Sequence, residues 1–202
     1  MGIQKMSQLA LFTGSASTAP NINGLSYIPD WITPDEEVEL ISIIDQQPWN
    51  TDLKRRVQHY GYAYDYKARN VTRDLYLGAL PDWLQPLVQK LASDGLFQAV
   101  PDQVIINEYL AGQGISPHID CIPCFGKTIA SLSLCSPCVM DFYKDTEKHS
   151  LMLERRSLLV LSHSTRYEWQ HGIAGRKTDK HDEQIISRTR RLSLTFRNII
   201  HQ

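Results

Sequence analysis

Two histidines and one aspartate carry the clearest chemical signal in the sequence. His118 and Asp120 are separated by one residue, so in an extended segment both side chains point to the same side and can converge on one ion. A second histidine must come from elsewhere, and His171, between the strand-like Tyr167–Gln170 and Gly172, is the best candidate. Two histidines and one carboxylate, with coordination positions left open, suit non-haem iron(II). A His-x-Asp triplet alone is common by chance, so this interpretation depends on its surroundings.

A second polar face is predicted near the C-terminus. The run Arg191-Leu-Ser-Leu-Thr-Phe-Arg197 alternates polar and apolar residues, as a strand with one buried face does. Its two arginines and Ser193 would share one face, where guanidinium groups can hold a small dicarboxylate through paired hydrogen bonds. Asn107 and Tyr109 alternate in the same way and could add amide and phenol hydrogen bonds. The alternative is that both arginines are solvated charges on an edge strand.

Helices are predicted in the first half of the chain and strands in the second. Thr33 can cap a first helix, Pro34 suits its first turn and Pro48 ends it, while a second helix spans about residues 81–95. Short apolar or alternating runs separated by turn residues follow Pro101. The predicted strands are 104–109, 128–134, 139–143, 158–161, 167–170 and 192–196.

This order of elements predicts an α+β fold, a jelly roll or β-sandwich supported by N-terminal helices. The 202 residues suit one domain, expected over 25–202, after a flexible N-terminal arm over 1–24 that is rich in small and polar residues. No apolar run approaches the roughly 20 residues of a membrane span, and no secretory signal is evident, so we expect a cytoplasmic protein, and a monomer. A net charge of −1 excludes a general polycation, so nucleic-acid binding would need local basic patches.

The cysteines form two pairs with the spacing of a zinc site, Cys121-Ile-Pro-Cys124 and Cys135-Ser-Pro-Cys138. In a reducing compartment we expect thiols or metal ligands and not disulfides. A strand over 127–134 would separate the pairs by roughly 25 Å, too far for zinc–sulfur bonds of about 2.3 Å. A zinc-stabilised binding module without turnover is therefore the weaker alternative to an enzyme.

In order, spacing and flanking residues, these motifs resemble those of the AlkB family of oxygenases. The stretch 107–120 is similar to the family's substrate-side strand and iron motif, His171-Gly-Ile to its distal iron ligand, and 191–197 to its closing arginine motif. The similarity covers about residues 25–200. It implies a double-stranded β-helix and a dioxygenase that uses iron(II), 2-oxoglutarate and O2 and releases succinate and CO2.

Carried over position by position, the resemblance implies roles for individual residues. Iron would be bound by His118, Asp120 and His171. The 2-oxoglutarate site would comprise Asn107, Tyr109, Arg191, Ser193 and Arg197. Arg191 would hold the far carboxylate, Arg197 would lie near the metal-chelating end, and Ser193 stands where bacterial repair enzymes often have asparagine.

The resemblance also implies a nucleic-acid substrate, DNA or RNA. Oxidative dealkylation of alkylated bases, with release of formaldehyde, is the first interpretation. Two features favour an alternative: Ile122 stands where bacterial repair enzymes carry an acidic residue for base recognition, and Arg55–Tyr66 is similar to a branch containing an animal tRNA wobble-uridine hydroxylase. Side-chain hydroxylation of a wobble uridine is therefore the second interpretation.

A basic and aromatic segment is the candidate nucleic-acid surface. Lys54, Arg55 and Arg56 precede alternating tyrosines that include Tyr62 and Tyr64. Basic residues can contact phosphates while an aromatic ring stacks on a flipped or single-stranded base. The tyrosines could equally form one face of a strand that packs on the core.

Overall fold

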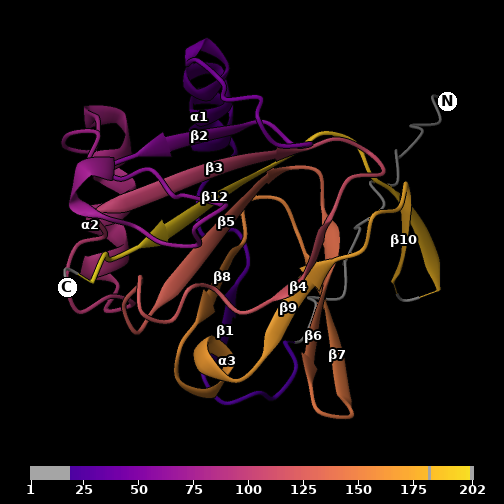
Figure 1. The fold of residues 1–202 in the computed structure, drawn as a ribbon. Coiled ribbons are helices and arrows are strands. Elements are labelled where there is room, and N and C mark those ends of the chain that lie inside the picture. The colour runs from indigo at the N-terminus through magenta and orange to yellow at the C-terminus, as the bar shows by residue number, and fades with distance from the viewer. Residues whose placement is uncertain (1–18, 182, 201–202) are drawn as a thin grey trace, which may run out of the picture.

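Two antiparallel sheets face each other in the computed structural model, which describes residues 19–181 and 183–200 (Figure 1). The larger sheet has the order β1 (Leu25–Ile28), β8 (Leu158–Leu161), β5 (Ile129–Cys135), β12 (Arg191–Arg197), β3 (Gln103–Tyr109) and β2 (Val57–Tyr60). The smaller sheet has the order β4 (Ile115–His118), β9 (Gln170–Ile173), β6 (Cys138–Lys144) and β7 (Glu147–Leu153). A hairpin of β10 (Thr178–His181) and β11 (Gln184–Ser187) projects beside them.

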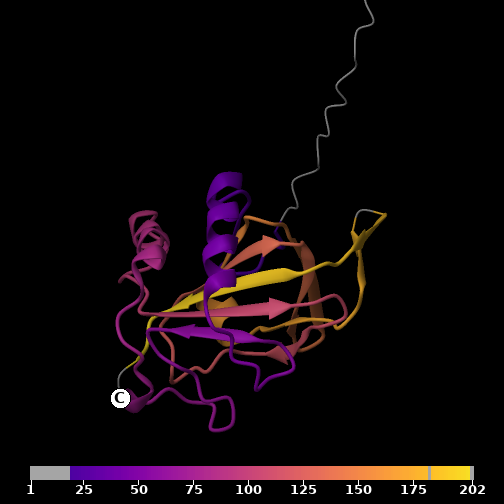
Figure 2. The ribbon, with the colours of Figure 1, turned by 90° about the horizontal axis from the view of Figure 1, so that it is seen from above.

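Helices α1 (Pro34–Gln46) and α2 (Gln85–Ser93) lie together on one face of the larger sheet (Figure 2). Thr33 caps α1 as predicted, because its hydroxyl accepts from the N–H of Glu36 and the Glu36 carboxylate accepts from the N–H of Thr33. The second predicted helix is confirmed as well, with a 3₁₀ turn, η2 (Asp82–Leu84), ahead of α2. Another 3₁₀ turn, η1 (Arg73–Leu75), and the short helix α3 (His163–Tyr167) complete the described helical elements.

Alternation along β12 divides the molecule into an apolar layer and a polar cavity. Leu192, Leu194 and Phe196 are fully buried in the cluster that joins the larger sheet to α1 and α2. The intervening side chains, including Arg191 and Arg197, line the space between the two sheets. A jelly roll supported by N-terminal helices is therefore confirmed, and its polar face lies inside the sandwich.

One prediction about local structure was wrong. Residues 167–170 do not form a strand: α3 ends at Tyr167, and β9 begins only at Gln170. The reason is tertiary, because Thr165 donates from its hydroxyl to the carbonyl of Asn23 and so anchors the helical turn on a distant segment. The alternative interpretation of Arg191 and Arg197 as charges on an edge strand is excluded, because β12 pairs with β3 on one side and β5 on the other.

Both ends of the chain extend partly outside the described residues. The arm expected over 1–24 lies mostly there, and only residues 19–24 are described. Within those, Ile22 is 6% exposed in the core between the sheets, so the packed chain starts before residue 25. No helix in the described part of the chain is long and apolar enough to cross a membrane.

Candidate active site

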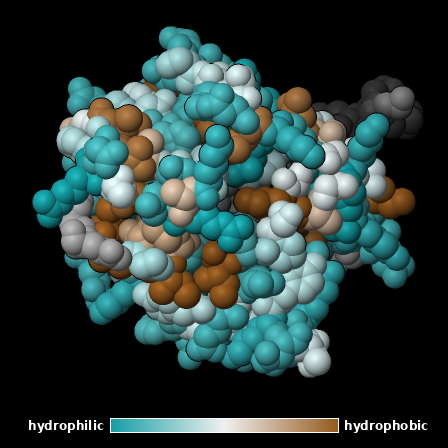
Figure 3. Space-filling model, viewed as in Figure 1, coloured by the Kyte–Doolittle hydropathy of each residue, from teal (hydrophilic) through white to brown (hydrophobic). Residues whose placement is uncertain are grey.

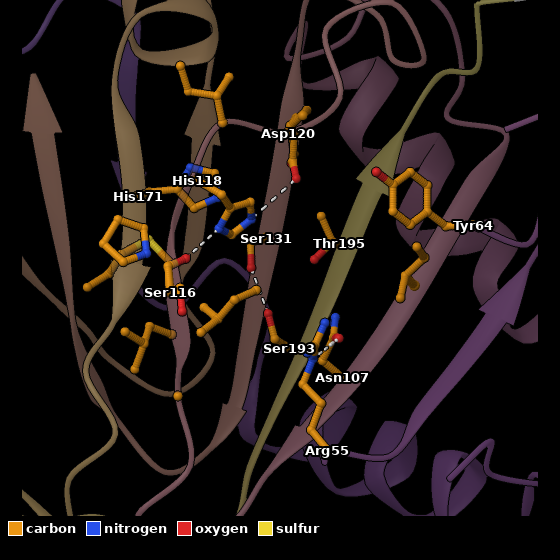
Figure 4. Close-up of a pocket in the computed structure, with 18 of the residues that line it drawn as sticks. Arg55, Tyr64, Asn107, Ser116, His118, Asp120, Ser131, His171, Ser193 and Thr195 are labelled. Atoms are coloured by element: carbon orange, nitrogen blue, oxygen red, sulfur yellow. Dashed lines mark hydrogen bonds and ion pairs between the residues drawn. The ribbon is translucent and has the colours of Figure 1, made fainter. Parts of the chain in front are cut away.

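The structure brings His118, Asp120 and His171 together between the two sheets. Their candidate ligand atoms all lie within 4.8 Å of one another. The two imidazole rings have centroids 4.5 Å apart, and His118 Nε2 lies 3.6 Å from Asp120 Oδ1. Figure 4 shows the three side chains pointing into one space. Two imidazole nitrogens and one carboxylate, facing a cavity that leaves room for further ligands, fit iron(II).

Strand pairing explains how residues 53 positions apart in sequence meet. His118 at the end of β4 is the register partner of His171 on β9, so the ladder holds the two rings opposite each other. Gly172 follows at a point where an added Cβ would lie 2.9 Å from the Pro117 nitrogen, which leaves space only for glycine. Asp120 lies beyond the end of β4 and reaches the same space from a loop.

The charges around the triad act differently on its members. Burial lowers the pKa of His118, but the hydrogen bond and the charge of Asp120 outweigh it and raise this pKa above its usual 6.5. Burial lowers the pKa of His171 to about 4, so this imidazole is neutral at physiological pH. Burial opposes ionisation of Asp120, but Arg197 and the histidines outweigh it and hold the pKa of this carboxyl well below its usual range. Arg197 Nη2 lies 3.3 Å from both carboxylate oxygens of Asp120. The aspartate is therefore an anion fixed in place from one side.

A dicarboxylate could bind deeper in the same cavity, where Arg191 is 3% exposed. Its Nη2 donates to the Ser133 hydroxyl at 2.8 Å, but its Nε and Nη1 have no hydrogen-bond partner among the described residues. Buried guanidinium donors without partners are costly, and a ligand carboxylate could accept from one of the two free donors. Burial raises the pKa of Tyr109, which keeps its hydroxyl protonated and able to donate beside Arg191. These residues fit 2-oxoglutarate.

Neighbouring strands supply polar groups that the sequence did not single out. Ser133 orients Arg191, and the Ser131 hydroxyl lies 2.9 Å from the Ser193 hydroxyl across the β5–β12 pair. Arg55 donates from Nε to Asn107 Oδ1 at 2.8 Å, which leaves the amide NH2 of Asn107 to donate to a ligand. The alternation of Ser131-Leu-Ser-Leu134 indicated a strand, but not which strand it would pair with.

The cavity has a volume of about 1250 Å³ and opens to the surface. In Figure 3 a recess lies near the middle of the face, bordered by both hydrophobic and hydrophilic side chains. Five residues, of which Lys54 and Arg69 are exposed, line the same cavity as the iron triad: Lys54, Arg55, Tyr64, Tyr66 and Arg69. We call these five residues the basic rim.

The structure separates the residues proposed for nucleic-acid contact. Arg56 does not line the cavity: it pairs with Glu108, and its guanidinium lies over the Trp49 ring. Tyr62 packs in a small cluster outside the lining, and its ring centroid lies 4.9 Å from that of Tyr76. The alternation of tyrosines does not describe one strand face, because β2 ends at Tyr60.

The cysteine predictions have two outcomes. Cys121 and Cys124 form a disulfide, so the expectation of thiols or metal ligands was wrong for this pair. The turn after Asp120 places their Cα atoms 5.3 Å apart, within the usual range for a disulfide. Cys135 and Cys138 are free, at the end of β5 and the start of β6. No four-cysteine zinc site therefore exists among the residues that the structure describes.

Known proteins share both the sequence pattern and the fold of this chain. Residues 24–197 match the model of the 2OG-Fe(II) oxygenase superfamily. An uncharacterised protein of Acanthamoeba polyphaga mimivirus is 37% identical, with 91% of this chain and 89% of that protein covered. The "Alkylated DNA repair protein ALKBH8 homolog" of Arabidopsis thaliana is 38% identical over 89% of this chain and 59% of its own length. The macaque (Macaca fascicularis) "tRNA (carboxymethyluridine(34)-5-O)-methyltransferase ALKBH8" is 39% identical over 87% and 30% respectively.

A solved structure entitled "The structure of OsALKBH1" shares the fold, with a TM-score of 0.65 and 18% identity over 90% of this chain and 99% of that one. The chain belongs to the 2OG-Fe(II) oxygenase superfamily. Within it, the chain is an AlkB-family dioxygenase that uses iron(II), 2-oxoglutarate and O2.

The residues divide the chemistry between them. His118, Asp120 and His171 would hold iron, which when bound activates O2 and the keto acid for C–H oxidation. Arg191, Tyr109 and Asn107 would orient 2-oxoglutarate through its far carboxylate. The reaction consumes a substrate C–H bond, O2 and 2-oxoglutarate, and yields C–OH, succinate and CO2. The protein's contribution is binding, orientation and exclusion of water.

Proposed function

We propose that this enzyme oxidises an alkyl group on a base in nucleic acid and thereby removes it. The observation that carries the proposal is the basic rim, which shares one cavity with the iron triad. Lys54 and Arg69 are exposed and could contact phosphates on a chain whose net charge is −1. Tyr64 and Tyr66 line the same cavity and supply aromatic rings, as expected for holding an unstacked base.

The atom that bears the alkyl group decides the product. Hydroxylation of a methyl group on a ring nitrogen produces an N–CH2–OH group, whose C–N bond breaks to release formaldehyde and the unmodified base. Hydroxylation of a side chain attached through carbon produces a stable alcohol. The name of the Arabidopsis relative, an alkylated DNA repair protein, supports the first outcome.

Hydroxylation of a tRNA wobble-uridine side chain is the second candidate. It is favoured by the name of the macaque relative, which refers to a carboxymethyl group on uridine 34 of tRNA. The chain spans 59% of the Arabidopsis protein and 30% of the macaque protein, so activities of those whole proteins carry over only as proposals. Ile122 at the cavity mouth adds an apolar contact where bacterial repair enzymes resembling this chain carry an acid.

The test is an oxygen-dependent assay after anaerobic iron loading, with succinate and formaldehyde measured together. Substrates are a methylated single-stranded DNA, the same sequence as methylated RNA, and tRNA carrying carboxymethyluridine. Unmethylated strands and the Arg191→Ala variant are the controls. Succinate and formaldehyde in equal amounts with a methylated strand would support dealkylation. Succinate with a hydroxylated nucleoside from tRNA, and no formaldehyde, would support the second candidate. No nucleic-acid-dependent succinate from any of them would overturn both.

A further inference from the structure

Arg166 is almost fully buried, and its guanidinium group donates hydrogen bonds to a single loop. It is 2% exposed, and no carboxylate of the described residues pairs with it. Its guanidinium donates to four backbone carbonyl oxygens at 3.0 to 3.3 Å, those of Asp120, Cys121, Phe125 and Gly126. The comparably buried Arg188, by contrast, pairs with the carboxylate of Asp179. A charge is costly to bury unless it is hydrogen-bonded, and here the four carbonyls and the ring of Tyr167, whose centroid lies 5.0 Å from the guanidinium carbon, compensate it.

The loop that accepts hydrogen bonds from Arg166 begins with Asp120, the aspartate of the iron site. The two histidines lie on paired strands, so the β4–β9 ladder fixes their relative position. Asp120 has no such constraint, because it follows the last residue of β4. Its carboxylate contacts Arg197, and its carbonyl accepts from Arg166 Nη1 at 3.0 Å. Arg166 therefore acts on the one ligand that the ladder does not hold.

The helix that carries Arg166 is itself held in place by hydrogen bonds to a distant segment. Arg166 belongs to α3, which lies directly ahead of β9 and His171. Thr165, the preceding residue, donates from Oγ1 to the carbonyl of Asn23 at 2.6 Å, and the Ser162 N–H donates to the Gly24 carbonyl at 2.8 Å. The helical turn is thus tied to the N-terminal segment. One side chain connects this anchored turn, which leads to His171, with the loop that carries Asp120.

We propose that Arg166 is a positioning residue that keeps Asp120 in register with the two histidines and so sets the affinity for the metal. Hydrogen bonds around metal ligands have this effect in general, and their loss costs about 10- to 100-fold in metal affinity. The assignment rests on iron binding at the triad and not on the identity of the organic substrate. It can therefore be tested without any nucleic acid.

The experiment measures binding of Mn(II), a redox-stable probe, to the full chain in the presence of 2-oxoglutarate. Arg166→Lys keeps the charge but cannot reach four carbonyls at once, and we expect a dissociation constant raised about tenfold. The matched control is Arg156→Lys, at the other end of β8, where the arginine pairs with Asp30 and Glu37. We expect it to bind Mn(II) within about twofold of the parent, even where its melting temperature falls.

A folded Arg166→Lys protein that binds Mn(II) as tightly as the control variant would overturn the proposal. If Arg166→Lys does not fold, Thr165→Val decides the question. This nearly isosteric change removes the hydroxyl bond to Asn23 and leaves Arg166 in place. We expect Mn(II) to bind severalfold more weakly to Thr165→Val, since one hydrogen bond to the anchor is lost. An unchanged dissociation constant in that variant would overturn the proposal as well.

Discussion

The two walls of the cavity are built differently. The cosubstrate wall consists of side chains on β3, β5 and β12, in the middle of a six-stranded sheet. Arg191 and Asn107 there are 3% and 8% exposed. The basic rim comes from the irregular chain around β2, and Lys54 and Arg69 are exposed. A strand paired on both sides holds its side chains in fixed register, whereas loops tolerate change. The contrast implies a preorganised site for a common cosubstrate and an adaptable one for a specific substrate.

The largest effect is expected at the metal site, whose histidines lie on β4 and β9 of the smaller sheet. Asp120→Ala should abolish measurable turnover while the fold is retained, because the iron site loses its one carboxylate. Succinate formation and the melting temperature would be measured side by side. Normal turnover by the variant would refute the iron assignment.

Arg191→Ala should raise the 2-oxoglutarate concentration needed for half-maximal rate by about 100-fold, since a buried charge pair is lost. The same requirement should be unchanged in Arg69→Ala, whose side chain is at the rim. Steady-state kinetics against 2-oxoglutarate would compare the two variants. Equal increases of the 2-oxoglutarate requirement in both variants would show that the rim and the buried strands do not differ in their contribution to cosubstrate binding.

The stability contributed by Glu37, which accepts a hydrogen bond from the backbone at the end of β5, should be lost in acid. Burial favours the neutral form of Glu37, but hydrogen bonds from Arg155 and from the Cys135 N–H outweigh it and lower the pKa of this carboxyl from its usual 4.5. A lowered folded-state pKa stabilises the fold fully above the unfolded value, and this stability is lost as pH falls through the folded value. Glu37→Gln should therefore cost about 2 kcal/mol at pH 7.

The difference in unfolding free energy between the parent protein and Glu37→Gln should shrink as pH falls below about 4.5, the usual value for a glutamate. Urea denaturation at pH 7 and at a pH near 3.5 would measure it. A difference that stays constant between the two conditions would show that ionised Glu37 contributes nothing to stability.

The smallest effects are expected at the rim. Lys54→Ala should raise the nucleic-acid KM severalfold and reduce the slope of log affinity against log salt by about one, as expected for one lost phosphate contact. Lys90→Ala on α2, at the helical layer, is the control and should change neither quantity. An unchanged salt slope for Lys54→Ala would remove this residue from the proposed binding surface.

Much of this architecture could be predicted from local sequence alone. The helix cap at Thr33 and the alternation along β12 are short-range patterns, and both appear in the structure as expected. The polar and apolar faces of β12 followed directly from residue type, although both faces are buried. The strand predicted at 167–170 failed because α3 is held by a contact between Thr165 and Asn23, which no local pattern contains.

The sequence by itself determined which residue types stand at which alternating positions, and so the polar face carrying Arg191 and Arg197 and the spacing of His118 and Asp120. Tertiary structure alone decided that β4 pairs with β9, so that His118 meets His171. It also decided that Arg166 donates hydrogen bonds to the loop that begins at Asp120. Periodicity is a property of neighbouring residues, whereas strand pairing and carbonyl–guanidinium contacts depend on how distant segments pack.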